Sequence, residues 1–174
     1  MKKALILIFS FIVASPVLSQ NFLLGGGPIY GDDIKEVGIN IRTYYNHPNG
    51  KICFGPEFSI FKTNKEVVNA DDMFEKDLYE INFNGHYFFP ISEKLIYYPV
   101  VGLNYSSEKE TLIMNDQVEE MKKVRVFGLN IGSGLHFEIS EKLMSYIEYD
   151  HLFSTLHQNS ITFGILLKIG QQEE

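Results

Sequence analysis

The segment "EYDHLFSTLH" at 148–157 holds the residue types that a hydrolase uses. Ser154 could act as the nucleophile, His151 as its general base, and Glu148 or Asp150 as the acid that orients the base. A general base must lie within hydrogen-bond reach of its nucleophile. On a strand, however, the three-residue spacing of His151 and Ser154 places them on opposite faces, because side chains alternate. We therefore expect neither a catalytic site nor enzymatic activity.

Two histidines suggest a second kind of chemistry. His86, His136 and Glu138 are residue types that bind zinc. Histidines that belong to a polar network inside a protein are far commoner than metal ligands. The glycine-rich segment "LLGGGP" at 23–28 lacks the strand-to-helix pattern of a phosphate-binding loop. We therefore expect no metal site and no cofactor.

The N-terminus has the layout of a secretory signal. Met1, Lys2 and Lys3 precede an apolar run over 4–14, and "SPVLSQ" follows it. The run is shorter than the roughly 20 residues that a transmembrane helix needs. We predict cleavage before Gln20, which separates a signal peptide over 1–19 from a single domain over 20–174.

Composition excludes two further classes. The net charge of the whole chain is −7. Loss of Lys2 and Lys3 with the signal would leave 13 basic against 22 acidic side chains, a net charge of −9. With only two arginines, such an acidic chain is unsuited to binding nucleic acid. Cys53 is the only cysteine, so no internal disulfide stabilises the domain.

Alternation dominates the rest of the chain. In "RVFGLNIGSGLHFE" at 125–138, one face carries Phe127, Leu129 and Ile131, and the other carries Gly128 and Asn130. This period of two is typical of a strand. It predicts eight strands, over 22–30, 37–45, 52–61, 78–89, 95–105, 125–138, 143–151 and 161–169.

A repeated phrase orders these strands. "FPISEKLIYY" at 89–98 and "FEISEKLMSY" at 137–146 share five consecutive residues, and both fall at a connection. The connections over 46–51, 90–94 and 139–142 are short and rich in turn residues. Those over 62–77 and 106–122 are long and acidic. This order predicts an antiparallel up-and-down meander with tight turns at one rim, where both copies of the phrase lie, and loops at the other.

Alternation alone does not say which face is wet. A soluble lipocalin-like barrel, apolar inside and binding a small hydrophobic ligand, remains the alternative to a membrane barrel, which is apolar outside. Strands of about ten residues suit a tilted bilayer crossing. Glycines and short polar groups suit a narrow interior. Aromatic residues near the strand ends suggest two interfacial girdles: Tyr44, Tyr45, Phe89, Tyr97, Tyr98, Phe137 and Tyr146 by the turns, and Tyr30, Phe61, Phe74, Tyr79, Tyr105, Phe127, Phe153 and Phe163 by the loops. We predict an all-β fold: an eight-stranded antiparallel up-and-down transmembrane β-barrel.

The polar face then becomes an interior network. Arg42 and Lys168 are the cations available to its carboxylates, which outnumber them, and an unpaired buried charge is costly. With eight strands, side chains should fill the lumen and leave no open pore. The predicted network comprises Arg42, Glu57, Glu80, Asn82, His86, Asn130, His136, Glu138, Glu148, Asp150 and Lys168.

The chain resembles the small outer-membrane β-barrel proteins of Gram-negative bacteria, the OmpA-like and OmpX-like group. The signal, "VFGLNIGSGLHFEIS", "YIEYDHLF" and the final "ITFGILLKIG" carry the resemblance across the mature chain. The resemblance implies an outer-membrane location, with a structural or surface-interaction role. It also implies membrane lipid, lipopolysaccharide and the barrel assembly machinery as partners, and a monomer. The last strand departs from the family, because it ends on Lys168-Ile169-Gly170 rather than on an aromatic residue. Some barrels of this architecture are lipid A deacylases, the enzyme class that His151 and Ser154 would serve.

The long connections raise one more hypothesis. Clustered carboxylates at an outer rim could bind divalent cations that also bridge lipopolysaccharide phosphates. A solvated, repulsive loop is the alternative that composition favours. The carboxylates are Glu66, Asp71, Asp72, Glu75 and Asp77 in 62–77, and Glu108, Glu110, Asp116, Glu119 and Glu120 in 106–122.

Overall fold

The computed structural model describes residues 21–69, 72–114 and 117–170. Within these ranges, no helix is long and apolar enough to cross a membrane. The predicted signal peptide over 1–19 and its cleavage site lie outside the described residues. The strands are β1 (Phe22–Gly31), β2 (Glu36–Asn46), β3 (Ile52–Phe61), β4 (Asn64–Asn69), β5 (Asp72–Tyr87), β6 (Phe89–Pro90), β7 (Leu95–Met114), β8 (Gln117–Ser140), β9 (Leu143–Phe153) and β10 (Gln158–Ile169).

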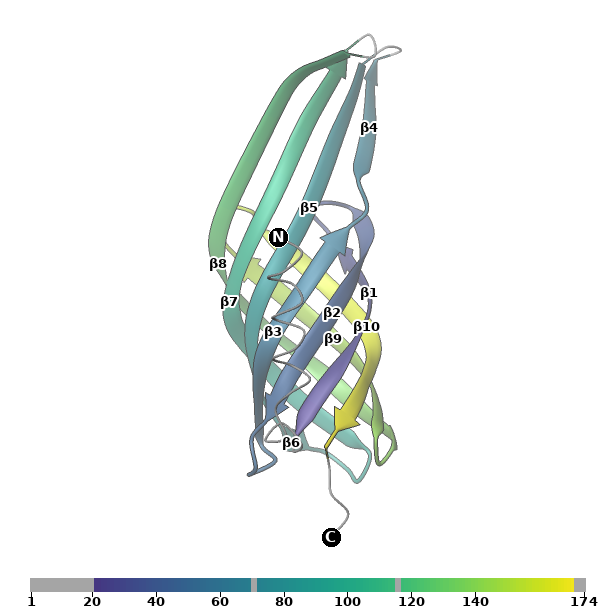
Figure 1. Ribbon diagram of the computed structural model, residues 1–174, viewed down its shortest axis with the longest axis vertical. Helices are drawn as coiled ribbons and strands as arrows, with labels where there is room; N and C mark the ends of the chain where they lie inside the picture. The colour runs from purple at the N-terminus through teal and green to yellow at the C-terminus, as the bar shows by residue number, and fades with distance from the viewer. Residues whose placement is uncertain (1–20, 70–71, 115–116, 171–174) are drawn as a thin grey trace, which may run out of the picture.

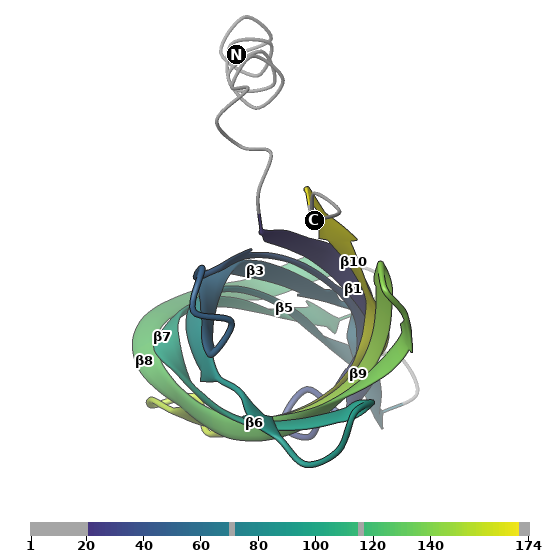
Figure 2. The same cartoon turned by 90° about the horizontal axis from the view of Figure 1, so that it is seen from below.

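Eight of these strands close a barrel. Each of β1, β2, β3, β5, β7, β8, β9 and β10 is antiparallel to its neighbours, and the pairings of β1 with β10 and of β5 with β7 complete the ring. Figure 2, a view along the barrel, shows the closed wall. The short strands β4 and β6 add to the edges of β5 and β7. The predicted eight-stranded up-and-down barrel is confirmed.

The tight turns gather at one rim, as predicted. Residues 47–51, 91–94 and 141–142 join consecutive barrel strands there, and β1 begins where β10 ends, with Phe22 opposite Ile169 (Figure 1). The two copies of "ISEK" therefore lie at the same rim. Outer-membrane barrels have short turns on the periplasmic side and longer connections outside. By this rule we expect the opposite rim to face out of the cell, and we call it the extracellular rim.

The barrel is apolar on its outer surface. Val101, Ile131 and Ile165 are 64%, 52% and 45% exposed, whereas Asn82 and Asn130 are 7% and 3% exposed. A lipocalin-like barrel would bury the first set and expose the second. That soluble alternative is wrong, because such an apolar outer surface requires hydrocarbon around it.

The two long connections differ from the prediction. Residues 62–77 and 106–122 are largely strand: β4 lies in the first segment, and β5, β7 and β8 continue past the barrel. They form a four-stranded sheet that projects from the extracellular rim (Figure 1). We call this sheet the wing: β4 with residues 72–78 of β5, 107–114 of β7 and 117–126 of β8. The sequence prediction of loops was wrong because charged residues on both faces hide the period of two.

The girdles also need correction. Tyr44, Tyr98, Tyr146 and Phe61 are at most 5% exposed and point into the barrel. Tyr98 lies opposite Gly134 and Tyr146 opposite Gly164 on the neighbouring strands. A Cβ atom on either glycine would lie within 3 Å of the tyrosine ring. The glycines therefore make room for inward rings. The outer surface keeps exposed aromatic residues at both ends, with Phe89 and Phe137 by the turns and Tyr30, Phe127 and Phe153 by the wing.

Candidate functional site

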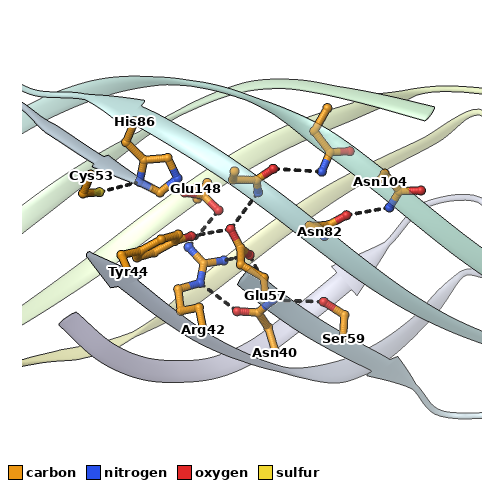
Figure 3. Close-up of polar contacts among 12 residues, drawn as sticks. Asn40, Arg42, Tyr44, Cys53, Glu57, Ser59, Asn82, His86, Asn104 and Glu148 are labelled. Atoms are coloured by element: carbon orange, nitrogen blue, oxygen red, sulfur yellow. Dashed lines mark hydrogen bonds and ion pairs between the residues drawn. The ribbon is translucent and has the colours of Figure 1, made fainter. Parts of the chain in front are cut away.

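Arg42 lies at the centre of the lumen and is 1% exposed (Figure 3). It forms ion pairs with Glu57 of β3 at 3.0 Å and with Glu148 of β9 at 2.8 Å. Its Nε atom donates to Asn40 Oδ1 at 2.7 Å, and its guanidinium stacks over the Tyr146 ring, 4.3 Å from the centroid. Because β9 is not a neighbour of β2 in the sheet, the pair with Glu148 spans the lumen. One cation thus joins strands on different sides of the barrel.

The Glu57 carboxylate accepts hydrogen bonds from several side chains of this cluster. Tyr44 donates its phenol hydrogen to one carboxylate oxygen, and Asn84 Nδ2 donates to the same oxygen at 2.6 Å. Asn40 Nδ2 donates to the other oxygen at 3.2 Å. Hydrogen bonds to an ionised acceptor are stronger than neutral ones. The Glu57 charge is therefore well satisfied despite its burial.

An asparagine network continues from this cluster toward the extracellular rim. Asn104 donates to Asn82 at 2.6 Å (Figure 3). Asn130 donates to Asn84 at 3.2 Å, and Ser106 donates to Asn104 at 2.7 Å. These side chains come from β5, β7 and β8. The network links strands by fixed hydrogen bonds and places no nucleophile beside a base.

An aromatic layer lies on the tight-turn side of Arg42. His86 stacks on Tyr98 with ring centroids 4.8 Å apart, and its Nδ1 atom lies 3.5 Å from Cys53 Sγ. His136 packs against Tyr98 and Phe88 at 4.3 and 5.4 Å. The two histidines therefore serve as packed rings within the lumen.

Apolar clusters lie on both sides of the polar centre. The one on the tight-turn side comprises Leu23, Tyr44, Cys53, Phe88, Tyr98, Val100, Met144, Tyr146 and Leu166. The one by the extracellular rim comprises Ile29, Ile34, Phe61 and Leu78. Ile34 belongs to the β1–β2 connection and is fully buried, so that connection folds over the mouth. The polar centre of the lumen thus lies between two clusters of apolar side chains.

The remaining carboxylates are separated along the barrel. Glu80 accepts a hydrogen bond from Gln158 at 2.9 Å, and with Asp150 it lines a polar cavity of about 10 Å³. That volume is about what one water molecule requires. Glu138 is only half-buried and pairs with Lys168 at 2.6 Å near the turns. The structure therefore places the eleven predicted residues at several levels of the lumen rather than in one site.

Several interior residues were not among those predicted. Asn40, Tyr44, Asn84, Tyr98, Asn104 and Tyr146 share the inward parity of the predicted residues on their strands. Strict alternation would have found them. Gln158 was missed for another reason, because its segment was predicted to be a connection.

The structure does not assemble the groups that the two chemical hypotheses need. His151 lies on the outer face and contacts Asn159 at 2.7 Å, whereas Glu148 points into the lumen. Ser154 Oγ donates to the Leu156 carbonyl. Glu138 is bound to Lys168 rather than to a histidine. Among the side chains that the structure describes, no group of three or more histidine, cysteine, aspartate and glutamate residues could hold a metal ion. The side chains of Asp71, Asp72, Asp116 and Glu119 lie outside that part of the structure.

Solved structures share this architecture. Ail, the attachment invasion locus protein of Yersinia pestis, matches with a TM-score of 0.57 and 13% identity, over 86% of this chain and 99% of Ail. The N-terminal β-barrel domain of Pseudomonas aeruginosa OprF matches with a TM-score of 0.58 and 15% identity, over 86% and 98%. Neisserial surface protein A matches with a TM-score of 0.53 and 12% identity, over 85% and 96%.

No family model matches the chain, and no curated protein matches it in sequence. At identities this low, the structural likeness establishes the fold. The predicted resemblance is confirmed at that level: the chain has the fold of the small β-barrels of the Gram-negative outer membrane.

Proposed function

We propose that this protein is a non-enzymatic integral barrel of the outer membrane that presents the wing at the cell surface. The observation that carries the proposal is the inverted distribution of side chains: an apolar outer wall around a polar, hydrogen-bonded interior. Hydrocarbon must cover Val101, Ile131 and Ile165, because water would leave a whole belt of apolar surface exposed.

The barrel serves as an anchor and not as a channel. Arg42 and its two glutamates cross the lumen, and apolar clusters flank them on both sides. A continuous water path would have to break these contacts. Purified protein in a planar bilayer should therefore give no discrete conductance steps, and regular steps would contradict the anchor role.

The wing is the part that is available to partners. Within the described residues, β4 pairs only with β5, and residues 117–128 of β8 pair only with β7. Edge strands of this kind can add a strand from another chain. A surface-interaction role through these edges is the function that we favour.

Cysteine labelling of intact cells tests location and orientation together. Cys53 is fully buried and gives a low background. Val67 of β4 is 73% exposed, so V67C should react with a membrane-impermeant maleimide on intact cells. The matched variant K142C, at the tight-turn rim, should react only after the outer membrane is permeabilised. The reverse pattern would show the opposite orientation, and equal reaction of both would contradict the membrane location.

The non-enzymatic role has its own test. Cells that overproduce the protein should show unchanged lipid A acylation by mass spectrometry. A loss of acyl chains that H151A and S154A abolish would establish a deacylase and contradict the proposal.

A further inference from the structure

Three cations gather on one face of the wing, directly above the barrel. Lys109 of β7 lies opposite Lys123 of β8, and Arg125 follows two residues nearer the barrel. By alternation they share the outward face of Phe127. Lys123 and Arg125 are exposed, and Lys109 is half-buried. We call these three residues the cation cluster.

The cation cluster lacks the acidic partners that other wing cations have. Lys65 pairs with Glu75 at 2.6 Å, and Lys76 pairs with Glu108 at 2.7 Å. Among the side chains that the structure describes, which leave out those of Asp72 and Glu119, no carboxylate lies within 4.0 Å of a cluster cation. Like charges directly opposite each other destabilise a sheet. The pairing of Lys109 with Lys123 is therefore a local cost that a bound anion would remove.

The charged groups around the cluster leave it net positive. Asp77 is the carboxylate opposite Lys109, and it accepts a hydrogen bond from Thr63 at 2.6 Å. A positive patch on so acidic a chain favours an anionic ligand.

An apolar groove begins where the cluster ends. Its volume is about 280 Å³. Phe127 is 83% exposed, and its ring lies 5.1 Å from that of Tyr105. Arg125 is about 7 Å from Phe127 along the strand. The groove is lined by Pro56, Ile81, Phe83, Leu103, Tyr105 and Phe127, together with Asn82, Asn104 and Gly128.

We propose that this face binds one phosphorylated lipid of the outer leaflet. The cation cluster holds the phosphate oxygens by charge-assisted hydrogen bonds, and the groove holds an acyl chain. The order of the two parts matches a lipid in the leaflet, with the charged group at the rim and the chain along the barrel wall. A second outer groove, beside Ile39 and Ile60, has only Lys62 at its edge, and Lys62 lies 3.9 Å from Glu36. The inference rests on the proposed outer-membrane location.

Native mass spectrometry of the protein in a zwitterionic detergent tests the site. The probes are lipid A, dephosphorylated lipid A and inorganic phosphate. We expect one lipid A to be retained. The variant K109Q/K123Q/R125Q should bind it at least about tenfold more weakly, since each lost hydrogen bond to a charged group is worth about one such factor. Dephosphorylated lipid A should show the same loss on the unaltered protein. F127S should also weaken retention.

The matched control is K35Q/K62Q/K65Q, which removes three cations from the same rim at other positions. It should retain lipid A as the unaltered protein does. Equal weakening in the control would show a diffuse charge effect and overturn the site. Equal binding of the dephosphorylated lipid would overturn the phosphate contact, and full competition by inorganic phosphate would overturn the groove.

Each variant must first show heat-modifiable migration on a gel, which reports a folded barrel. F127S leaves the cation cluster intact, so the groove is tested even where the triple variant fails to fold. The proposed location is tested separately by the V67C labelling. A negative lipid result with surface labelling intact would remove only this inference.

Discussion

The barrel and the wing share three strands but have different surroundings. β5, β7 and β8 run through both, and β7 and β8 reach 20 and 24 residues. In the barrel, one face meets hydrocarbon and the other a crowded lumen, so the two faces differ sharply in polarity. In the wing, charged residues occur on both faces, with the half-buried Lys109 on one and the buried Glu108 and half-buried Glu110 on the other, so the two faces do not differ sharply in polarity. An alternating sequence pattern therefore shows that the two faces of a strand lie in different environments. It does not reveal a strand whose two faces are alike.

Ion pairs show the same contrast. Arg42 with Glu57 and Glu148 is buried, whereas Lys122 of the wing pairs with Glu110 at 3.7 Å and is 64% exposed. Removing one partner of a buried pair leaves an unpaired buried charge. An exposed pair is screened by water and contributes little.

The largest effect should come from R42M. We expect a loss of about 3–5 kcal/mol in the free energy of unfolding, because two buried carboxylates lose their cation. K122M should cost less than about 1 kcal/mol. Urea titration in detergent, with folded protein followed by heat-modifiable migration, measures both. Similar losses for the two variants would remove the distinction between lumen and wing.

A charge introduced on the outer face should reduce the free energy of unfolding more in the barrel than in the wing. The difference should be smaller than that between R42M and K122M. Val101 and Val118 are 64% and 58% exposed, but only Val101 lies in the middle of the barrel wall. V101R should cost about 2–4 kcal/mol, since hydrocarbon surrounds it at the midplane. V118R should stay within about 0.5 kcal/mol. The same titration, in lipid vesicles, measures them, and a harmless V101R would contradict a hydrocarbon environment.

The smallest effect concerns the base of the wing. Lys76 lies 2.7 Å from both Asp33 and Glu108, and so ties the β1–β2 connection to the wing. K76M should loosen the wing locally by about 1 kcal/mol, seen as roughly fivefold faster amide exchange over 72–78. Barrel unfolding should not change. Slower exchange, or a shift in barrel unfolding, would show that Lys76 does not act as a local tie.

The pH dependence of this tie has a definite sign. Partial burial would lower the pKa of Lys76, but hydrogen bonds to Asp33 and Glu108 outweigh it and raise the pKa above its ordinary value of 10.5. The stabilisation is therefore fully present below the ordinary value and is lost as pH rises through the raised one. From neutral pH upward, the difference between K76M and the unaltered protein should stay constant until that region. A decline near neutral pH would contradict it.

Sequence reasoning went furthest where two environments act on one strand. Residues 125–138 were assigned correctly, since Phe127, Leu129 and Ile131 alternate with Gly128 and Asn130. It failed over 106–122, where cross-strand pairing rather than burial makes the strand. The run Thr111–Met114 contains residues that favour β-strands and so indicated a strand. The charged residues around it led instead to the prediction of a loop.

The aromatic residues teach a related lesson. Nearness to a strand end placed Tyr98 in a girdle, but its parity with Val100 and Asn104 places it inside. Whether a ring fits there depends on the neighbouring strand, where Gly134 lies opposite. No pattern within one strand contains that information.

The sequence by itself determined the barrel strands, the rim at which "ISEK" turns lie and the polarity of each barrel face, because these follow from local period and turn chemistry. Only the tertiary structure decided that Arg42 reaches Glu148 across the lumen, that apolar clusters flank that pair, and that the long connections pair into a wing that carries the cation cluster on one face. These features depend on register and closure, which bring together residues far apart in the chain.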